Sequence, residues 1–509
     1  MLRRWLRINR KSAAPYLMIF SVAVVLWCAA VPVTDAFRLR QTNYIEGWSV
    51  YNAQIVAEHR QLYPTTYDWI AVNYPPLSFH IIAALSRITS DYLFTGRALS
   101  LLGLVLTGVF AALIVWHLTR SRFAAWMTGL FMVGIFCANA NSYPGMDDPQ
   151  LFAQAFYVAA LYVYIRGGRK GWAIEATALL LALAINIKHS LIEFPIAILI
   201  DLCFTSPRRA LRLAFAGALL GAVSAVLAIH FDGPAYIACL LASRRYAILG
   251  AIAKTVDFFL PILPIVLVAL WTARSAFKNP AQRVLAILLF CALPLNSVLS
   301  GGGGTATNQM FGSLIAIVLL VGIFFADFPA LTRGRLSALQ PSALCALFFL
   351  WLALVPFTDS HFLFISHTAH WRTIQTIRER SESERLFALR VDFLRRQPGP
   401  ALCESLLTCY YAGKRYIYEP QNATRFIAQG KLDPAVMVNR LRNHEFGAVQ
   451  MDYGIQAKLS GPRPDRNFAV PILLAVQAYY SPGYVDREGT IYLPKDDSQK
   501  ASPNLAESH

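Results

Sequence analysis

The stretch YIEGW, residues 44–48, places the acidic side chain of Glu46 just beyond the first long apolar segment of the chain. A second acidic pair, Asp147-Asp148, follows the third apolar segment. A carboxylate at the exit of a membrane helix must either reach water or have a function. Two such sites on one face of a membrane protein would therefore indicate a catalytic centre at the bilayer surface.

The composition of the chain indicates a mainly α-helical, polytopic membrane protein. Of its 509 residues, 56% are hydrophobic and 15% are charged, whereas soluble domains carry about 25% charged residues. The net charge of +17 would suggest nucleic acid in a soluble protein, but most of the excess lies in short loops between apolar segments. There it reports orientation, so no nucleic-acid partner is expected.

Eleven apolar segments are candidate membrane spans, and the first is read as a retained span because it lacks a good small-residue cleavage site. Several are shorter than the roughly 20 apolar residues that a perpendicular helix needs, so flanking polar residues are expected to complete them. The segments are Tyr16–Val33, Leu93–Leu118, Phe123–Ala138, Leu151–Tyr164, Trp172–Ile187, Leu191–Phe204, Leu213–Ile229, Phe258–Trp271, Val284–Leu299, Met310–Phe325 and Ala343–Phe357.

The positive-inside rule orients these spans. All cations of the alternate connections fall on one side of the membrane if the eleven spans are real. The N-terminus is then predicted to be cytoplasmic and the C-terminus to lie outside. The cations are Arg3, Arg4, Arg7, Arg10, Lys11, Arg120, Arg122, Arg166, Arg169, Lys170, Arg208, Arg209, Arg212, Arg274, Lys278, Arg283, Arg333 and Arg335.

The first outer loop is predicted to contain two helices that lie in the membrane interface. Residues 44–59 carry apolar side chains at roughly helical spacing, which indicates a short amphipathic helix. The sequence Asn73-Tyr74-Pro75-Pro76 then breaks the chain, and Leu77–Leu85 resumes as an apolar helix too short to span.

The chain changes character after the last apolar segment, so a membrane module of residues 1–357 and a small outer α/β domain of residues 358–495 are expected. The domain should begin with a helix over Thr373–Arg395 and continue with short β-like runs. Examples of these runs are Tyr416–Tyr418, Gly447–Asp452 and Thr490–Leu493. Residues 496–509 are predicted to be disordered.

Cys403 and Cys409 both lie in this outer domain. An oxidising compartment would permit a disulfide between them. Two cysteines six residues apart can equally stay reduced, so the pattern leaves both states open.

Each acidic loop also has an ordinary structural explanation. An interfacial Glu is usually solvated, and aromatic neighbours such as Tyr44 and Trp48 often anchor a helix at the interface. The sequence Asp147-Asp148-Pro149 is compatible with a helix start, because acidic residues cap N-termini and proline favours the first turn. Neither loop taken alone indicates function.

Two cationic pairs on the outer side are candidates for binding an anionic group. Lys188-His189 lies at a tight outer turn, where an anionic lipid headgroup would stabilise the lysine. Arg244-Arg245 could make bidentate phosphate contacts. For both pairs the alternative is snorkelling to the phosphates of membrane lipids. The run Gly301–Gly304, followed by Asn308, could cradle a phosphate, although a flexible hairpin is the commoner meaning.

The order of these features resembles the integral-membrane glycosyltransferases of the C superfamily (GT-C). An acidic residue on an interfacial helix is followed by an aromatic-Pro-Pro-Leu turn at Tyr74–Leu77 and by a second acidic loop before the fourth span. The organisation from about Tyr16 to Phe325 is most similar to the bacterial family 39-like group, which includes lipid A aminoarabinose transferases and related arabinosyltransferases. The tail also looks like the outer domain of some bacterial members.

The resemblance implies transfer of a sugar from a polyprenyl phosphate donor to a glycolipid or polysaccharide acceptor, on the periplasmic face of a bacterial inner membrane. Glu46 would be the general base, and a single base without a covalent intermediate predicts inversion. Asp147 or Asp148 would orient the acceptor or hold a divalent cation. Because Tyr74 stands where several members have lysine, this phosphate contact must be absent or come from other residues. The candidates are Lys188, His189, Arg244 and Arg245 for the phosphate, and Tyr44, Trp48, Tyr74 and Asn308 for the substrate.

Two non-enzymatic functions remain open from the sequence, namely a transporter of lipid-linked saccharides and a scaffold of an envelope complex. A transport route should carry ionisable groups near the bilayer midplane, whereas Lys and Arg cluster here at the ends of the spans. A scaffold would use the outer domain for docking. A phosphoethanolamine-type transferase is discounted, because the tail shows no obvious metal-ligand spacing.

Overall fold

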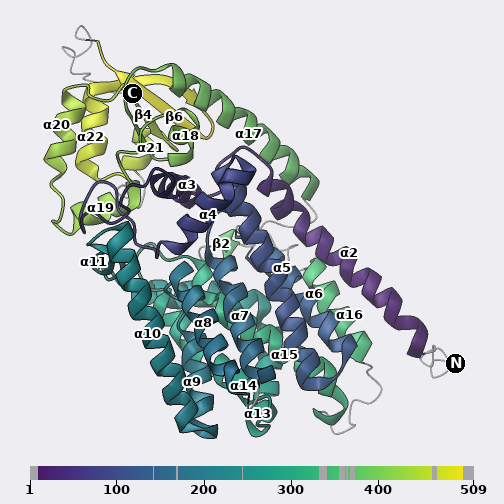
Figure 1. Ribbon diagram of the computed structural model, residues 1–509. Helices are drawn as coiled ribbons and strands as arrows, with labels where there is room; N and C mark the ends of the chain where they lie inside the picture. Colours follow the sequence, from purple (N-terminus) through teal and green to yellow (C-terminus); the bar gives the residue numbers. More distant parts are fainter. Residues whose placement is uncertain are drawn as a thin grey trace.

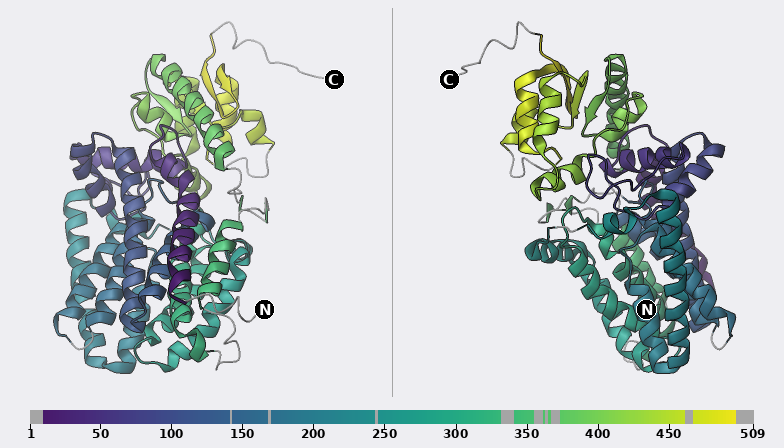
Figure 2. Two further views of the ribbon diagram at one scale, coloured as in Figure 1. Left: turned by 90° about the vertical axis from the view of Figure 1, so that its right-hand side faces the viewer. Right: turned by 60° about the vertical axis from the view of Figure 1, so that its left-hand side comes forward.

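The structure is a computed structural model that describes residues 10–140, 143–167, 170–242, 245–331, 341–354, 361–362, 365–366, 373–460 and 467–496. A bundle of long helices forms one layer, and a smaller α/β region covers one end of the bundle (Figure 1). The two turned views show the same two layers, with the α/β region on the same end of the helices (Figure 2).

Each of the eleven predicted spans coincides with a helix over most of its described residues, although α9 begins only at Glu193, two residues after the predicted start at Leu191. Residues 355–357 of the last span lie outside the described part of the chain. The corresponding helices are α2 (Arg10–Ala36), α5 (Tyr92–Thr119), α6 (Arg122–Asn139), α7 (Gln150–Gly167), α8 (Trp172–Ile187), α9 (Glu193–Thr205), α10 (Pro207–Asp232), the end of α12 (Ile248–Phe259) with η1 (Leu260–Ile262) and α13 (Leu263–Lys278), α14 (Arg283–Leu299), α15 (Phe311–Leu331) and α16 (Pro341–Leu354). The short helix α11 (Tyr236–Leu240) follows α10.

Six helical stretches of the described chain are long and apolar enough to cross a membrane, and shorter apolar helices lie alongside them in the bundle (Figure 1). Burial differs strongly between them. In the stretch that contains α15, 89% of the most apolar 18 residues are buried, whereas in α10 the corresponding share is 11%. The outward side chains of α10, such as Phe215 and Val226, form an apolar face suited to lipid. The protein is therefore a multi-pass membrane protein with α15 in its interior.

The described turns that carry predicted cytoplasmic cations, such as those between α9 and α10 and between α13 and α14, lie at the end of the bundle away from the α/β region (Figure 1). This placement agrees with the expectation that alternate loops share one side. Which side faces the cytoplasm stays a prediction. Arg3, Arg4, Arg7, Arg169, Arg333 and Arg335 lie outside the described residues.

Two helices, α3 (Tyr44–Ala57) and α4 (Leu77–Thr89), lie where the first outer loop is predicted to have interfacial helices. The Asn43 side chain caps α3 by accepting from the backbone N–H of Ile45. In contrast to the expected amphipathic helix, ten of the 14 residues of α3 are buried. The reason is its position, because α3 is covered by the bundle on one side and by the α/β region on the other (Figure 1).

The α/β region is built on a mixed sheet of four strands in the order β3-β4-β6-β5. β3 (Ala401–Cys403) is parallel to β4 (Ala448–Met451), whereas β6 (Gly489–Pro494) is antiparallel to both β4 and β5 (Tyr480–Asp486). The long helix α17 (Thr373–Arg396) precedes the sheet, as predicted. The remaining elements are the paired strands β1 (His361–Phe362) and β2 (Ile365–Ser366) and the helices α18 (Leu406–Tyr411), α19 (Pro420–Ala428), α20 (Pro434–Arg442), α21 (Ile455–Leu459) and α22 (Val470–Tyr479).

The strands predicted at residues 447–452 and 490–493 are confirmed as β4 and β6, but the strand predicted at residues 416–418 is wrong. Its aromatic rings pack on partners outside the sheet. Tyr416 stacks on Tyr51 of α3 with ring centroids 4.6 Å apart, and Tyr418 stacks on Phe468 at 5.3 Å. This segment therefore joins the α/β region to α3.

Cys403 and Cys409 form a disulfide that joins the end of β3 to α18. The predicted boundary between residues 357 and 358 lies outside the described residues, as do residues 497–509 of the predicted disordered tail.

Candidate active site

Glu46 is fully buried in the first turn of α3 and forms an ion pair with Arg97 of α5. Arg97 Nε donates to Glu46 Oε1 at 2.7 Å, and Nη2 donates to Oε2 at 2.9 Å. The backbone N–H groups of Asp147 and Thr42 donate to the same two oxygens at 3.2 and 2.7 Å. Each carboxylate oxygen of Glu46 therefore accepts two hydrogen bonds.

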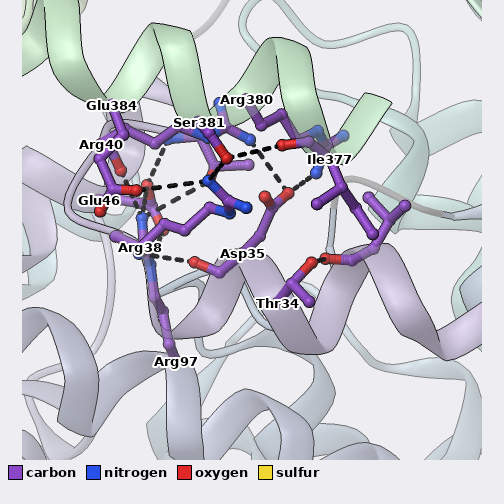
Figure 3. A network of polar contacts seen from close by, with 12 residues as sticks. Thr34, Asp35, Arg38, Arg40, Glu46, Arg97, Ile377, Arg380, Ser381 and Glu384 are labelled. Atoms are coloured by element: carbon purple, nitrogen blue, oxygen red, sulfur yellow. Dashed lines mark hydrogen bonds and ion pairs between the residues drawn. The ribbon is translucent and has the colours of Figure 1, made fainter. Parts of the chain in front are cut away.

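Arg97 is absent from the sequence-predicted site, yet it is the centre of this arrangement. Besides Glu46, its guanidinium donates to the backbone carbonyls of Asp35, Arg38 and Arg40 at 3.0, 2.6 and 2.7 Å (Figure 3). A signal for this residue was present in the sequence. An arginine inside the apolar segment 93–118 is costly unless it has partners or a function.

Asp147 lies beside Glu46 in the loop between α6 and α7. Its Oδ1 accepts from Ser49 Oγ at 3.0 Å, whereas Oδ2 has no hydrogen-bond partner among the described residues. Burial, and then the negative charge of Glu46, raise the pKa of Asp147 well above its ordinary value. Gly96 of α5 allows this approach, because a Cβ there would collide with the Asp147 carboxylate. A buried carboxylate with a raised pKa and an open oxygen is suited to accept a proton.

A small cavity lies next to the two aspartates, between α4, α5 and the start of α7. Ser78 of α4 and Ser100 of α5 line it together with Asp147 and Asp148. Its volume of about 10 Å³ is room for roughly one water molecule. The space beside the two aspartates is therefore small in this structure.

Lys188, at the end of α8, supplies a cation on the other side of the aspartate pair. Its Nζ lies 3.6 Å from Asp148 Oδ2 and 3.6 Å from the centroid of the Tyr74 ring. Asp148 also caps α7, because its Oδ1 accepts from the backbone N–H of Gln150 at 2.8 Å. The Tyr74 ring thus lies beneath the ammonium group of a lysine from another loop.

The Tyr74 ring lies between the part of the site that contains Glu46 and the part that contains Lys188. The Trp48 ring approaches it edge-on at 5.0 Å, and the His189 ring lies 6.5 Å away. Trp48 Nε1 also donates to the Ala71 carbonyl at 3.2 Å, which fixes the indole. The helix that carries Glu46 and the turn that carries Lys188 therefore contact one another through aromatic rings.

The remaining predicted substrate residues lie at the margins of this arrangement. Asn308, in η2 (Thr307–Met310), is buried, and its carbonyl accepts from Gln150 Nε2 at 3.2 Å. It therefore lies directly behind the Asp148 cap. Tyr44 is half-buried at the start of α3.

Arg245 has a different environment from Lys188. It is exposed, and its Nη2 donates to the Ala428 carbonyl of α19 at 3.0 Å. Its own carbonyl accepts from Gly303 at 2.7 Å, so the glycine run pairs with this loop. Among the described residues, these contacts place Arg245 at α19 and not at the Lys188–Asp148 pair. Arg244 lies outside the described residues.

The two aspartates do not converge on one position. Asp147 contacts Ser49, whereas Asp148 faces Lys188. In the part of the chain that the structure describes, no group of three or more His, Cys, Asp or Glu side chains could hold a metal ion. The divalent cation suggested for Asp147 and Asp148 therefore rests on the resemblance alone.

Fold and site together define a multi-pass membrane protein whose buried charged centre lies between a helical bundle and an α/β region. No family model matches the chain, and no curated protein matches it in sequence. Solved structures do match. The fold is similar to that of ArnT from Cupriavidus metallidurans bound to undecaprenyl phosphate, with a TM-score of 0.59 and 11% identity over 94% of this chain and 98% of ArnT.

The apo structure of the same ArnT gives a TM-score of 0.58 at 12% identity, again over 94% of this chain and 98% of that one. A weaker likeness, with a TM-score of 0.44 at 12% identity over 93% of this chain and 73% of the other, is found with the Archaeoglobus fulgidus oligosaccharyltransferase. The ArnT matches confirm the predicted fold, a mainly helical membrane protein with a small C-terminal sheet and an ArnT-like arrangement of its elements.

Proposed function

We propose that the protein is a glycosyltransferase that moves a sugar from a polyprenyl phosphate donor to a glycolipid or polysaccharide of the bacterial cell envelope, on the periplasmic face of the inner membrane. One observation carries the proposal. A carboxylate with an open oxygen, Asp147, adjoins Asp148, which holds the buried cation of Lys188. The likeness to ArnT supports it, since one ArnT structure holds undecaprenyl phosphate.

Lys188 is the candidate for the donor phosphate. Its ammonium group lies 3.6 Å from Asp148 Oδ2, on the cationic side of the site, where it would meet the phosphate of a bound donor. A fixed cation at this position stabilises the negative charge that develops on the leaving phosphate. Tyr74 and Trp48 would flank the sugar-phosphate end of the donor.

Asp147 is the candidate for the general base. The acceptor hydroxyl gives its proton to Asp147 Oδ2 while its oxygen attacks the anomeric carbon of the sugar. The bond between that carbon and the phosphate oxygen breaks, and polyprenyl phosphate leaves with the electron pair. A single displacement of this kind inverts the anomeric configuration.

This assignment differs from the sequence-based one, in which Glu46 is the base. Both oxygens of Glu46 already accept two hydrogen bonds each, including the bidentate pair from Arg97. Its contacts favour a positioning role, in which Glu46 fixes the Asp147 backbone and helps to raise the pKa of the Asp147 carboxyl.

Two variants, Asp147→Asn and Glu46→Gln, separate the assignments. With the purified protein and a polyprenyl-phosphate sugar, release of polyprenyl phosphate should fall by about 10²–10⁴-fold in Asp147→Asn. Wild-type transfer should also decline as the pH falls through the raised pKa of Asp147, because the base must be deprotonated. Glu46→Gln should keep a measurable rate, with the acid limb moved to lower pH, because the charge of Glu46 helps to raise the pKa of Asp147.

A deletion strain complemented with each variant identifies the product. Loss of one sugar from one envelope polymer in the deletion strain, restored by the wild type and not by Asp147→Asn, supports the proposal. Full transfer by Asp147→Asn would exclude it as the base, and an inactive but stable Glu46→Gln would return that role to Glu46. Normal envelope glycans in the deletion strain would contradict the enzymatic function.

A further inference from the structure

We propose that α17 of the α/β region is a positioning element for the active site, acting on the Glu46–Arg97 pair through the segment of residues 35–42. The inference rests on the proposed function, because this pair belongs to its site. It gives the C-terminal region a role in transfer itself, through the named contacts of Arg38, Ser381 and Glu384.

The inner side of the segment surrounds the Arg97 guanidinium. Three carbonyls, from Asp35, Arg38 and Arg40, accept its N–H groups that do not point at Glu46. The segment also donates to Glu46 itself, through the Thr42 backbone N–H at 2.7 Å. The orientation of Arg97 is therefore set by the shape of this one stretch of backbone.

The outer side of the same segment is held by α17. Arg38 Nη1 donates to Ser381 Oγ at 2.6 Å and pairs with Glu384 Oε2 at 3.3 Å. The other oxygen of Glu384 accepts from the backbone N–H of Leu39 at 2.7 Å. Figure 3 shows how both sets of contacts converge on the segment from opposite sides.

A second anchor lies one turn earlier on α17. Arg380 pairs with Asp35, which is buried at the end of α2 and also pairs with Arg40 at 3.0 Å. Two successive parts of the segment, around residues 35 and 38–40, are thus fixed by neighbouring residues of one helix. The contacts are spaced so that α17 holds the segment at two points.

The segment has little internal structure of its own after α2 ends at Ala36, since residues 37–43 form turns and bends. Its shape depends on contacts from both sides. If the α17 side is released, the carbonyls can rotate away from Arg97, and the guanidinium loses acceptors that align it with Glu46. Any change at Glu46 then reaches Asp147, through the hydrogen bond from the Asp147 backbone and through the charge beside its carboxyl.

The test compares Glu384→Ala with Glu382→Ala in the full-length protein. Glu382 lies on the same helix and pairs with Arg385, at 2.7 Å within that helix, so its loss removes a similar charge without touching the contacts of the segment. Glu384→Ala should lower kcat by roughly tenfold to a hundredfold, as misplacement by a remote change can. The KM for the polyprenyl-phosphate sugar should change little, and the acid limb of the pH profile should shift.

The charge-exchanged double variant Arg38→Glu with Glu384→Arg provides the rescue. It restores the ion pair across the junction and should recover part of the kcat lost in Glu384→Ala, while thermal unfolding of every variant checks that the protein is folded. An unchanged kcat and pH profile in Glu384→Ala, or an equal loss in Glu382→Ala, would overturn the inference. A wild-type protein that does not release polyprenyl phosphate would instead contradict the proposed function, before any variant is compared.

Discussion

The acidic and the cationic halves of the site are held in opposite ways. Glu46 accepts four hydrogen bonds, and Arg97 directs its donors to Glu46 and three backbone carbonyls. Lys188 instead lies 3.6 Å from Asp148 and over an aromatic ring. The comparison indicates that the Glu46–Arg97 half stabilises the fold, whereas the proposed role of the Lys188 half is to contact the donor phosphate.

The largest effect on stability is expected from Arg97→Gln. Removing one partner of a buried ion pair leaves an uncompensated charge, which costs about 3–5 kcal/mol. Thermal unfolding in detergent or nanodiscs should therefore show a strongly lowered Tm, and the double variant Arg97→Gln with Glu46→Gln should regain part of the loss. If Arg97→Gln had the same Tm as the wild type, the Glu46–Arg97 pair would not stabilise the fold, and the two halves would not differ in this respect.

For Lys188→Gln we expect the larger effect on sugar transfer and the smaller effect on stability. Transfer should fall by roughly 10²–10³-fold, because the leaving phosphate loses its fixed cation. The Tm should fall by less than in Arg97→Gln, because Asp148 loses its buried ion-pair partner but keeps the hydrogen bond from the Gln150 backbone. The measurements are kcat with a polyprenyl-phosphate sugar and thermal unfolding of the same preparation. A Tm loss as large as that of Arg97→Gln would show that both halves are structural.

Another buried carboxylate, Glu419, extends the comparison and has the smallest expected effect. It accepts from the backbone N–H groups of Gln421 and Asn422 at 3.1 and 2.6 Å, and burial raises its pKa from 4.5 to about 7. Because its folded-state pKa is raised, ionisation is disfavoured in the folded state. The stability of the neutral form is complete below pH 4.5 and is lost as the pH rises through about 7.

The Tm of the wild type should therefore fall as the pH rises from 5 towards 8, by an amount equivalent to on the order of 2–3 kcal/mol. Glu419→Gln should flatten this dependence, whereas Glu382→Gln, at an exposed position on α17, should not. If Glu419→Gln leaves the pH dependence of the Tm unchanged, another group is responsible for it.

The helices could be predicted from the sequence because a membrane span is a local property of about 20 residues. The ion pair of Glu46 could not be predicted, because Arg97 and the carbonyls that surround its guanidinium come from separate parts of the chain. The useful signal was charge in an apolar segment. It marks Arg97, and it also marks Glu193 at the start of α9, which is fully buried.

The segment at residues 416–418 shows the same limit in another form. Its aromatic residues favour a strand in isolation, but tertiary contacts with Tyr51 and Phe468 decide its conformation. Likewise, the sequence alone does not distinguish Lys188 from Arg245, since both are cations on predicted outer loops. Only the packing shows that one lies over Tyr74 and the other at α19.

The close contact between α3 and α18 has a consequence for the biogenesis of the protein. A Cβ on Gly47 would collide with the backbone of Leu406 and Leu407, and Tyr51 Oη donates to the Lys414 carbonyl at 2.7 Å, across 363 residues of sequence. Chains fold from the N-terminus as they are made, so α3 and the bundle precede the region that covers them. A partly synthesised chain would hold its carboxylates without their cover. Completion of the chain is thus the event that places α18 against α3, and a truncated protein would be expected to leave Gly47 and Tyr51 uncovered.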